Sequence, residues 1–176
     1  MSVFKLRRFQ IKHDKCAMKI GTDGLLLGAW ADMSSAERVL DVGTGCGVIA
    51  VMCAQRKQDA LIWGIDIDEM AVCQARDNVA MSPCAKNVFI DVADYRNFTF
   101  NDSSTNELFT NIVSNPPYFI ENTTSPDEKR SLARNSNSLP FEDLLKNSSE
   151  MLCEGGRLSI IVPTSVAYLV ISSAVK

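Results

Sequence analysis

The stretch SNPPYF, residues 114–119, places an amide, two prolines and two aromatic rings directly after an apolar run. Each proline fixes its own φ angle and donates no backbone hydrogen bond, and a residue before a proline is held extended. The chain therefore leaves the predicted sheet in a fixed direction and holds the Asn115 amide and the Tyr118 ring rigidly. Such a turn can present a hydrogen-bonding amide and a stacking ring to a ligand. It is also compatible with a stiff turn whose aromatics pack into the core.

A second candidate site is the glycine-rich segment LDVGTGCGVIA. The pattern predicts a strand that ends near Asp41, then a tight turn with Gly43, Gly45 and Gly47 that opens a helix. Glycines let a ligand approach the backbone and leave free N–H groups at the helix start. The dinucleotide fingerprint requires its third glycine where Val48 stands. This departure argues against a nicotinamide dinucleotide and favours a nucleoside ligand without a pyrophosphate.

Aspartates close the next two predicted strands, Asp66 after ALIWGI and Asp94 after NVFIDVA. A carboxylate at such a position can accept hydrogen bonds from both hydroxyls of a ribose. Asp66 could instead cap the helix that starts near Asp68. Together with Asp41, both acids fall at the carboxyl ends of parallel strands, where open α/β sheets bind ligands in a crevice.

Short apolar runs alternate with longer amphipathic ones and predict the elements that position these residues. The predicted strands cover residues 37–43, 60–66, 87–94, 107–114 and 157–163. The predicted helices cover residues 46–57, 68–82 and 139–153, with a C-cap at Gly155-Gly156, and a further helix begins at residue 164. Residues 95–106 are polar and predict a loop in which FTF adds a brief extended piece. This order predicts an α/β fold with a doubly wound, mostly parallel sheet and helices on both faces.

The composition is that of a globular protein. The chain has 176 residues, of which 46% are hydrophobic and 22% charged, and this suits one domain with its own core. No apolar run reaches the roughly 18 residues of a membrane span. The N-terminus lacks the apolar segment typical of a signal peptide. We therefore expect no membrane partner and a cytoplasmic location.

Six cysteines are present, but none forms a C-x-x-C pair. Cys46, Cys53 and Cys73 fall in predicted helices among small or apolar residues, so buried free thiols are expected rather than disulfides or zinc ligands. His13 is the only histidine, which excludes a His-rich metal site or a His-based triad within this chain. We expect chemistry without a metal, and a structural or RNA-contacting role for His13.

Charge is unevenly distributed along the chain, whose net charge is −3. The first twenty positions carry one acid and six basic residues, Lys5, Arg7, Arg8, Lys12, Lys15 and Lys19. A basic arm on an acidic body suits a polyanionic partner. The same segment is compatible with a solvated terminus that binds nothing.

Taken together, the segment Asp41–Gly47, Asp66, Asp94 and the N-P-P-Y motif at residues 115–118 resemble the ordered motifs of class I S-adenosylmethionine-dependent methyltransferases that act on amino groups. The N-terminal stretch FQIKHDKCAMKIGTDGLLLGAW strongly resembles bacterial tRNA methyltransferases that modify N6 of adenine-37 in valine tRNA. The resemblance extends from about Phe9 to Pro163. It implies a Rossmann-like fold, S-adenosylmethionine as cofactor and tRNA as substrate.

The resemblance also implies roles for single residues. Asp41 and the Gly43–Gly47 turn would hold the methionine part of the cofactor, Asp66 its ribose and Asp94 its adenine amine. Thr22 and Asp23 match a family segment that packs near the methionine end. These roles are carried over from the family, position by position.

For catalysis, the resemblance implies Asn115, Pro116 and Tyr118. The Asn115 amide oxygen and the Pro116 carbonyl would accept the two protons of the target amine, so that its lone pair is aimed at the methyl group. Tyr118 or Phe119 would stack on the extruded base. Contacts with RNA are expected from the motif, the arm and the polar loop 121–138, which could close over the base; the residues are Pro117, Phe119, Lys12, Lys15, Lys129, Arg130 and Arg134.

The sequence leaves several alternatives open. The N-P-P-Y motif also serves enzymes that methylate adenine in DNA or rRNA, or a glutamine amide in a protein. A nicotinamide-dependent oxidoreductase is disfavoured by Val48 and leaves Asn115 without a role. A catalytically silent RNA-binding subunit is disfavoured because all four site elements are intact.

The organisation expected from the sequence has two parts. Residues 1–36 form a basic arm with a capping helix, and residues 37–176 form the cofactor-binding catalytic domain. The family fold continues with an antiparallel hairpin after the fifth strand, so we expect the natural chain to be longer, with the RLSIIV strand otherwise at an exposed edge. A monomer is the default expectation.

Overall fold

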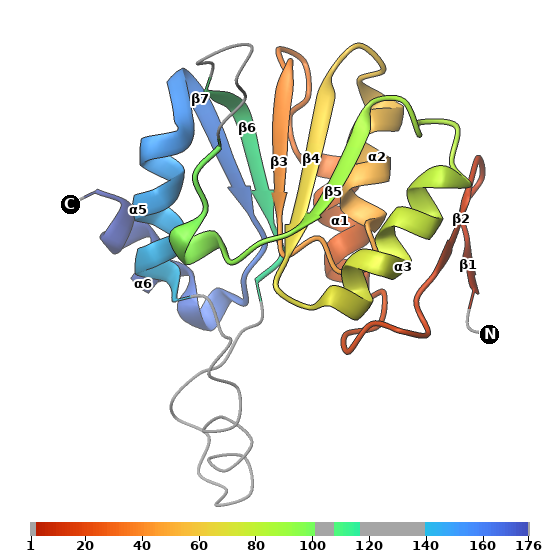
Figure 1. Ribbon diagram of the computed structural model, residues 1–176. Coiled ribbons are helices and arrows are strands. Elements are labelled where there is room, and N and C mark those ends of the chain that lie inside the picture. Colours follow the sequence, from red (N-terminus) through yellow and green to blue (C-terminus); the bar gives the residue numbers. More distant parts are fainter. Residues whose placement is uncertain (1–2, 101–107, 117–139, 176) are drawn as a thin grey trace, which may run out of the picture.

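A five-stranded parallel sheet forms the centre of the computed structural model, which describes residues 3–100, 108–116 and 140–175 (Figure 1). In chain order its strands are β3 (Arg38–Val42), β4 (Leu61–Asp66), β5 (Val88–Val92), β6 (Phe109–Ser114) and β7 (Leu152–Ile160). They lie in the order β5-β4-β3-β6-β7, and every neighbouring pair is parallel. The predicted α/β class is confirmed.

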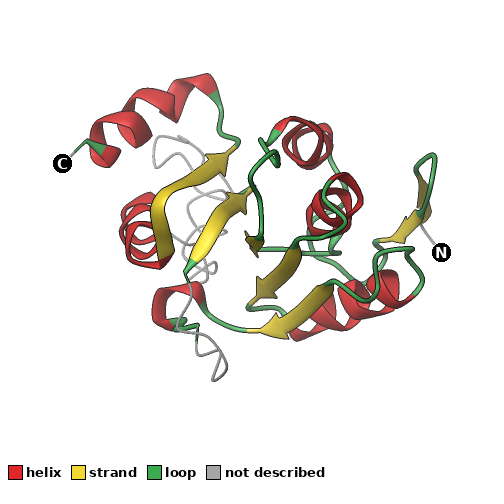
Figure 2. Cartoon of the chain, turned by 90° about the horizontal axis from the view of Figure 1, so that it is seen from above, coloured by secondary structure: helices red, strands yellow, loops and turns green. Residues whose placement is uncertain are grey.

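Helices cover both faces of the sheet, as the view from above shows (Figure 2). One face packs against α1 (Thr22–Trp30), α2 (Val48–Arg56) and α3 (Glu69–Ala80). The other packs against the short helix η1 (Tyr95–Asn97) and α5 (Phe141–Met151), with α6 (Thr164–Ala174) beside α5. Side chains alternate between the two faces along a strand, so Val39 joins the first cluster and Leu40 the second.

The order of the strands reverses beside β3. The chain passes from β3 to β4 and β5 on one side, then returns to place β6 and β7 on the other. A crevice forms at such a reversal, outside the carboxyl ends of the strands. Here those ends bring together the glycine turn after β3 and Asn115 after β6.

The N-terminal segment shares its core with the sheet. A small antiparallel hairpin, β1 (Val3–Lys5) and β2 (Gln10–Lys12), lies beside α3 at the right of Figure 1. Phe9 and Ile11 are buried in the same hydrophobic cluster as Leu27 of α1. The predicted boundary between an N-terminal part, residues 1–36, and a catalytic domain, residues 37–176, therefore stays a prediction.

The predicted end of the helix before the last strand is wrong. Helix α5 ends at Met151, and β7 begins at once with Leu152, so Gly155-Gly156 lies within the strand. Gly155 has a φ of 75°, and the pairing with β6 shifts register between Phe109 and Asn111. The two glycines accommodate an irregularity in the strand rather than a helix C-cap. β7 is an edge strand of the described sheet, as expected.

Two further local predictions need correction. Cys73 is exposed on α3, and Cys84 and Cys153 are partly exposed, with Cys84 packed at the margin of the first core cluster; the buried free thiols are Cys16, Cys46 and Cys53. The FTF piece forms no paired strand, although the backbone is extended at Phe98 as expected, with a φ of −72° and a ψ of 125°. Its Phe100 ring instead packs edge-on against Trp63, with 4.9 Å between ring centroids.

Candidate active site

The glycine turn is fastened to the end of β4. The backbone nitrogens of Gly43 and Thr44 both donate to the Ile65 carbonyl, at 2.9 Å each. Gly47 has a φ of 80°, and a Cβ there would lie 3.2 Å from the Cβ of Ala75 on α3. A side chain is therefore disfavoured at Gly47 by both backbone conformation and space.

The side chain of Asp41 holds the glycine turn through hydrogen bonds. Its side chain is fully buried, and Oδ2 accepts hydrogen bonds from the Thr44 hydroxyl at 2.7 Å and from the Ala50 nitrogen at 3.1 Å. Its Oδ1 atom is buried without a hydrogen-bond partner among the described residues. Burial raises the pKa of Asp41 to about 7, against the two hydrogen bonds that lower it.

Asp66 joins the end of β4 to the turn. Its Oδ2 atom accepts a hydrogen bond from the Gly45 nitrogen at 2.8 Å, and Oδ1 accepts one from the Asp68 nitrogen at 3.0 Å. The alternative that Asp66 caps α3 is wrong, because Asp68 is the N-cap and accepts from the Met70 nitrogen at 2.9 Å. A carboxylate has about four lone-pair sites, so the Asp66 oxygens can accept further bonds from a ligand.

Asp94 is held by Arg96. Its carboxylate accepts from the Arg96 backbone nitrogen at 3.0 Å and from the guanidinium, with 2.5 Å between Nη2 and Oδ2. The Arg96 side chain lowers the pKa of Asp94 below its ordinary value. The carboxylate is thus kept ionised and in a fixed orientation at the rim of the crevice.

Asn115 and Pro116 follow β6 directly, on the other side of β3. The Ser114 hydroxyl donates to the Val42 carbonyl at 2.8 Å, which anchors the end of β6 to β3. The first turn of α1 approaches the motif, since a Cβ on Gly24 would lie 3.8 Å from the Asn115 amide nitrogen.

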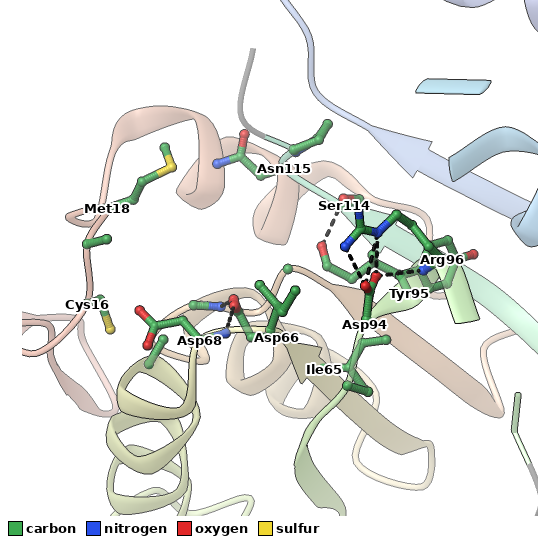
Figure 3. A pocket seen from close by; sticks show the side chains of 18 residues that line it. Cys16, Met18, Ile65, Asp66, Asp68, Asp94, Tyr95, Arg96, Ser114 and Asn115 are labelled. Carbon is green, nitrogen blue, oxygen red and sulfur yellow. Dashed lines mark hydrogen bonds and ion pairs between the residues drawn. The ribbon is translucent and has the colours of Figure 1, made fainter. Parts of the chain in front are cut away.

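A cavity of about 230 Å³ opens among these elements (Figure 3). Met18 and Asn115 lie along one rim in this view, with Asp66 and Asp68 across from them and Asp94 with Arg96 at a third side. Six predicted site residues line this cavity, Gly43, Gly45, Asp66, Asp94, Asn115 and Pro116.

Other predicted site residues stand elsewhere. Asp41 and Gly47 shape the turn behind the cavity, and Thr22 and Asp23 begin α1 without lining it. The remaining motif and loop residues, Pro117, Tyr118, Phe119, Lys129, Arg130 and Arg134, lie outside the described residues.

The predicted basic arm is partly committed to internal contacts. Lys19 donates from Nζ to the carbonyls of His13, Asp14 and Cys16, at 3.0 to 3.1 Å. Lys15 forms an ion pair with Asp77 at 3.7 Å. Nδ1 of His13 accepts from the Ile20 nitrogen at 3.2 Å, a structural role as expected.

The cavity-lining residues that sequence reasoning missed include Cys16, Met18, Asp68, Arg96 and Ser114. Asp68 was expected only near a helix start, although its position two residues after Asp66 could have suggested a second acid at the rim. For Arg96 the sequence carries no signal, because its role depends on a three-residue helix that turns it back onto Asp94.

The chemistry of the walls defines the ligand class. Carboxylates of Asp66, Asp68 and Asp94 favour donors and positive charge, while apolar side chains such as Ile65 and Ile67 offer a slot for a flat ring. This combination fits a cationic nucleoside.

The described residues contain no cluster of His, Cys, Asp or Glu able to hold a metal. No helix within the described parts is long and apolar enough to cross a membrane.

The family model of the methyltransferase small domain matches residues 17–172. The chain belongs to this methyltransferase family. The curated relatives of this methyltransferase include a tRNA1(Val) (adenine(37)-N6)-methyltransferase of Bacteroides thetaiotaomicron, 46% identical over 97% of this chain and 70% of the relative. Proteins of the same name from Parabacteroides distasonis and Aeromonas salmonicida are 44% and 42% identical, over 91% and 94% of this chain and 66% and 68% of theirs. The predicted family is confirmed.

This methyltransferase spans about two thirds of the length of those relatives. Solved structures show the same fold at low sequence identity. TrmN from Thermus thermophilus has a TM-score of 0.61 and 22% identity, over 86% of this chain and 40% of its own. A predicted O-methyltransferase, Atu636 from Agrobacterium tumefaciens, has the same TM-score, identity and coverage of this chain, and 66% of its own length is covered.

Proposed function

We propose that this protein transfers a methyl group from S-adenosylmethionine to the N6 amine of an adenine in tRNA, with adenine-37 of valine tRNA as the target. The observation that carries the proposal is that Asn115 and Pro116 line the same cavity as the glycine turn, Asp66 and Asp94. The names of the curated relatives support the substrate. A cytoplasmic location accords with a tRNA substrate.

The residues present fit S-adenosylmethionine. Asp66 is positioned by the Gly45 and Asp68 nitrogens so that its carboxylate can accept from two ribose hydroxyls, and Asp94 can accept from the adenine amine. The glycine turn and the acidic wall suit the positively charged methionine end. When bound, the cofactor supplies an electrophilic methyl group on a sulfonium.

Asn115 and Pro116 would act on the amine that receives the methyl group. An exocyclic amine is a weak nucleophile because its lone pair is delocalised into the ring. Acceptance of its two N–H protons by the Asn115 amide oxygen and the Pro116 carbonyl draws the nitrogen towards tetrahedral geometry and frees the lone pair. The contribution of the protein is positioning and electrostatics, so no strong general base is required. The product loses its proton to water.

The roles of Tyr118 as a stacking residue, and of Pro117, Phe119, Lys12, Lys15 and Arg134 as RNA contacts, remain part of the proposal. Membership of the methyltransferase family argues against the nicotinamide-dependent oxidoreductase. DNA, rRNA and protein amides remain alternative substrates of the same chemistry. That the protein works without a metal, and that it is a monomer, also stay predictions.

The test is a substrate comparison. In separate reactions, the full chain and methyl-labelled S-adenosylmethionine are incubated with one of four substrates: unmodified valine tRNA, duplex DNA, rRNA or a glutamine-containing release-factor domain. Nucleoside digestion of the tRNA should give N6-methyladenosine as the labelled product. Label in DNA, rRNA or protein, with none in tRNA, would overturn the substrate and keep the chemistry.

A further inference from the structure

Helix α3 carries two polar side chains that the proposed chemistry does not use. Gln74 and Asn78 are 1% and 0% exposed, and lie one helical turn apart on the same side of the helix. Both point away from solvent, towards the N-terminal segment. Burial of an amide is costly unless its hydrogen bonds are made, so their partners indicate what they are there to hold.

Asn78 connects the N-terminal segment with the glycine turn. Its Oδ1 atom accepts from the Lys12 nitrogen at 2.9 Å. Its Nδ2 atom donates to the Lys12 carbonyl at 2.8 Å and to the Cys46 carbonyl at 2.9 Å. One side chain therefore bonds both backbone groups of Lys12 and the Cys46 carbonyl of the glycine turn.

Gln74 fixes the segment three residues further on. Its Oε1 atom accepts from the Lys15 nitrogen at 2.7 Å and lies 3.9 Å from the Cys16 sulfur, and its Nε2 atom donates to Asp14 at 3.3 Å. The next residues of the chain, Ala17 and Met18, line the cavity together with Cys16.

We propose that Gln74 and Asn78 are positioning residues that hold Cys16, Ala17 and Met18 in place as one wall of the cofactor site. This inference rests on the proposed function. The wall is not part of the sheet, and its place against the glycine turn depends on contacts from α3, which itself begins at the cavity rim with Asp68 as N-cap. The same two amides hold Lys12 and Lys15, so the cofactor wall and the arm proposed to contact RNA share one support.

A positioning role predicts a specific kinetic pattern. Loss of either amide should leave the wall poorly placed and weaken binding of cofactor and tRNA. The chemical step at Asn115 should stay intact once both are bound. KM for S-adenosylmethionine should therefore rise while kcat stays within about twofold, the pattern expected when uniform binding is lost.

The experiment compares Gln74→Met and Asn78→Ala with wild type and with Cys73→Ala, a control at an exposed position of the same helix. Binding of S-adenosylhomocysteine is measured by calorimetry well below each melting temperature. Trypsin cleavage after Lys12, Lys15 and Lys19 is followed with and without that ligand. We expect about tenfold weaker binding in both variants, a loss typical of one buried hydrogen-bonding group, and faster cleavage in the arm. Cys73→Ala should match wild type.

Unchanged affinity and KM in both variants would overturn the inference, even if their melting temperatures fall. Gln74→Met keeps the length and helix propensity of the side chain and leaves the Cys46 contact intact, so it decides the matter if Asn78→Ala does not fold. Failure of the wild type to bind S-adenosylhomocysteine would instead contradict the proposed function. In that case the cleavage rates without ligand still test the positioning role, since equal rates in wild type and Gln74→Met would refute it.

Discussion

The carboxylate of Asp66 accepts a hydrogen bond from the backbone nitrogen of Gly45 at 2.8 Å, so the acid at the end of β4 and the glycine turn after β3 form one unit. The second oxygen of Asp66 is oriented by the Asp68 nitrogen. Both carboxylate oxygens are thus fixed before any ligand arrives, which lowers the entropic cost of binding.

Asp66 is only partly exposed, but its replacement should weaken ligand binding strongly. We expect Asp66→Ala to weaken S-adenosylhomocysteine binding by at least about tenfold, because the acceptors for the ribose and the support of Gly45 are lost together. Calorimetry measures the effect. Asp59→Ala, at an exposed aspartate paired with Lys57, is the matched control and should bind as wild type does. Equal affinities in the two variants would contradict the role of Asp66.

The buried carboxyl of Asp41 predicts how stability depends on pH. Burial raises the pKa of Asp41 to about 7 in the folded protein, from an ordinary value of 3.8, so the folded state binds the proton more tightly than the unfolded state. The free energy of unfolding should then decrease as pH rises from 4 to 7, by up to about 1.4 kcal/mol per pH unit from this group, and level off above 7.

Asparagine does not titrate, so Asp41→Asn should lack this contribution. Urea unfolding of wild type and variant at pH 4.5, 5.5, 6.5 and 7.5 gives the difference in free energy at each pH. The difference should move in favour of the variant as pH rises. A difference that is constant across this range would show that Asp41 is not protonated in the folded protein.

The turn conformation predicts the cost of a side chain at Gly47. Its positive φ and the close Cβ of Ala75 should make Gly47→Ala destabilising by about 1–3 kcal/mol in urea unfolding. Gly21→Ala is a control without these two constraints, because its φ is −106° and a Cβ there meets nothing within 4 Å; as the N-cap of α1 it should lose less than about 1 kcal/mol. Equal losses at the two positions would argue against strain at the turn.

The pair formed by Asp94 and Arg96 predicts a pH effect on binding. Arg96 lowers the pKa of Asp94, so the ionised carboxylate is present above that lowered value and is lost only as pH falls through it. In Arg96→Gln the pKa of Asp94 should rise, and binding of S-adenosylhomocysteine should weaken at a higher pH than in wild type.

Arg76→Gln is the control for this effect, because Arg76 also pairs with an aspartate, Asp91, at 2.8 Å but does not line the cavity. Its binding curve against pH should match that of wild type. Superimposable curves for wild type and Arg96→Gln would show that the pair does not govern ligand binding.

Much of the site was predictable, because short apolar strands alternate with amphipathic helices along the chain. This order makes the strands parallel, so that all their carboxyl ends lie at one edge of the sheet. Once β3, β4 and β5 are recognised, Asp66 and Asp94 must fall at one edge of the sheet, and the prolines after Asn115 place it at the same edge. The prediction that Asp41 contacts a ligand rests on its place at a strand end and on the family resemblance, but the structure places its side chain behind the turn, outside the cavity lining.

The parts that sequence could not supply depend on tertiary contacts. The backbone of Lys12 and Lys15, just before the cavity-lining residues 16–18, is hydrogen-bonded by amides of α3 about sixty positions away. Pairing with β6 sets where β7 begins. The sequence instead predicted a helix up to residue 153, because glycines such as Gly155-Gly156 commonly follow the end of a helix. Exposure of Cys73 follows from the rotation of α3 against the sheet, which its composition does not fix.

The central claim is that the Asn115 turn transfers a methyl group to an adenine amine. Its most direct test is single-turnover methyl transfer to unmodified valine tRNA, with wild type, Asn115→Ala and the exposed control Asn97→Ala compared at saturating S-adenosylmethionine. We predict N6-methyladenosine at equal rates in wild type and Asn97→Ala, and a rate at least about a hundredfold lower in Asn115→Ala, as for loss of one group that stabilises a transition state. Undiminished transfer in Asn115→Ala would contradict the account.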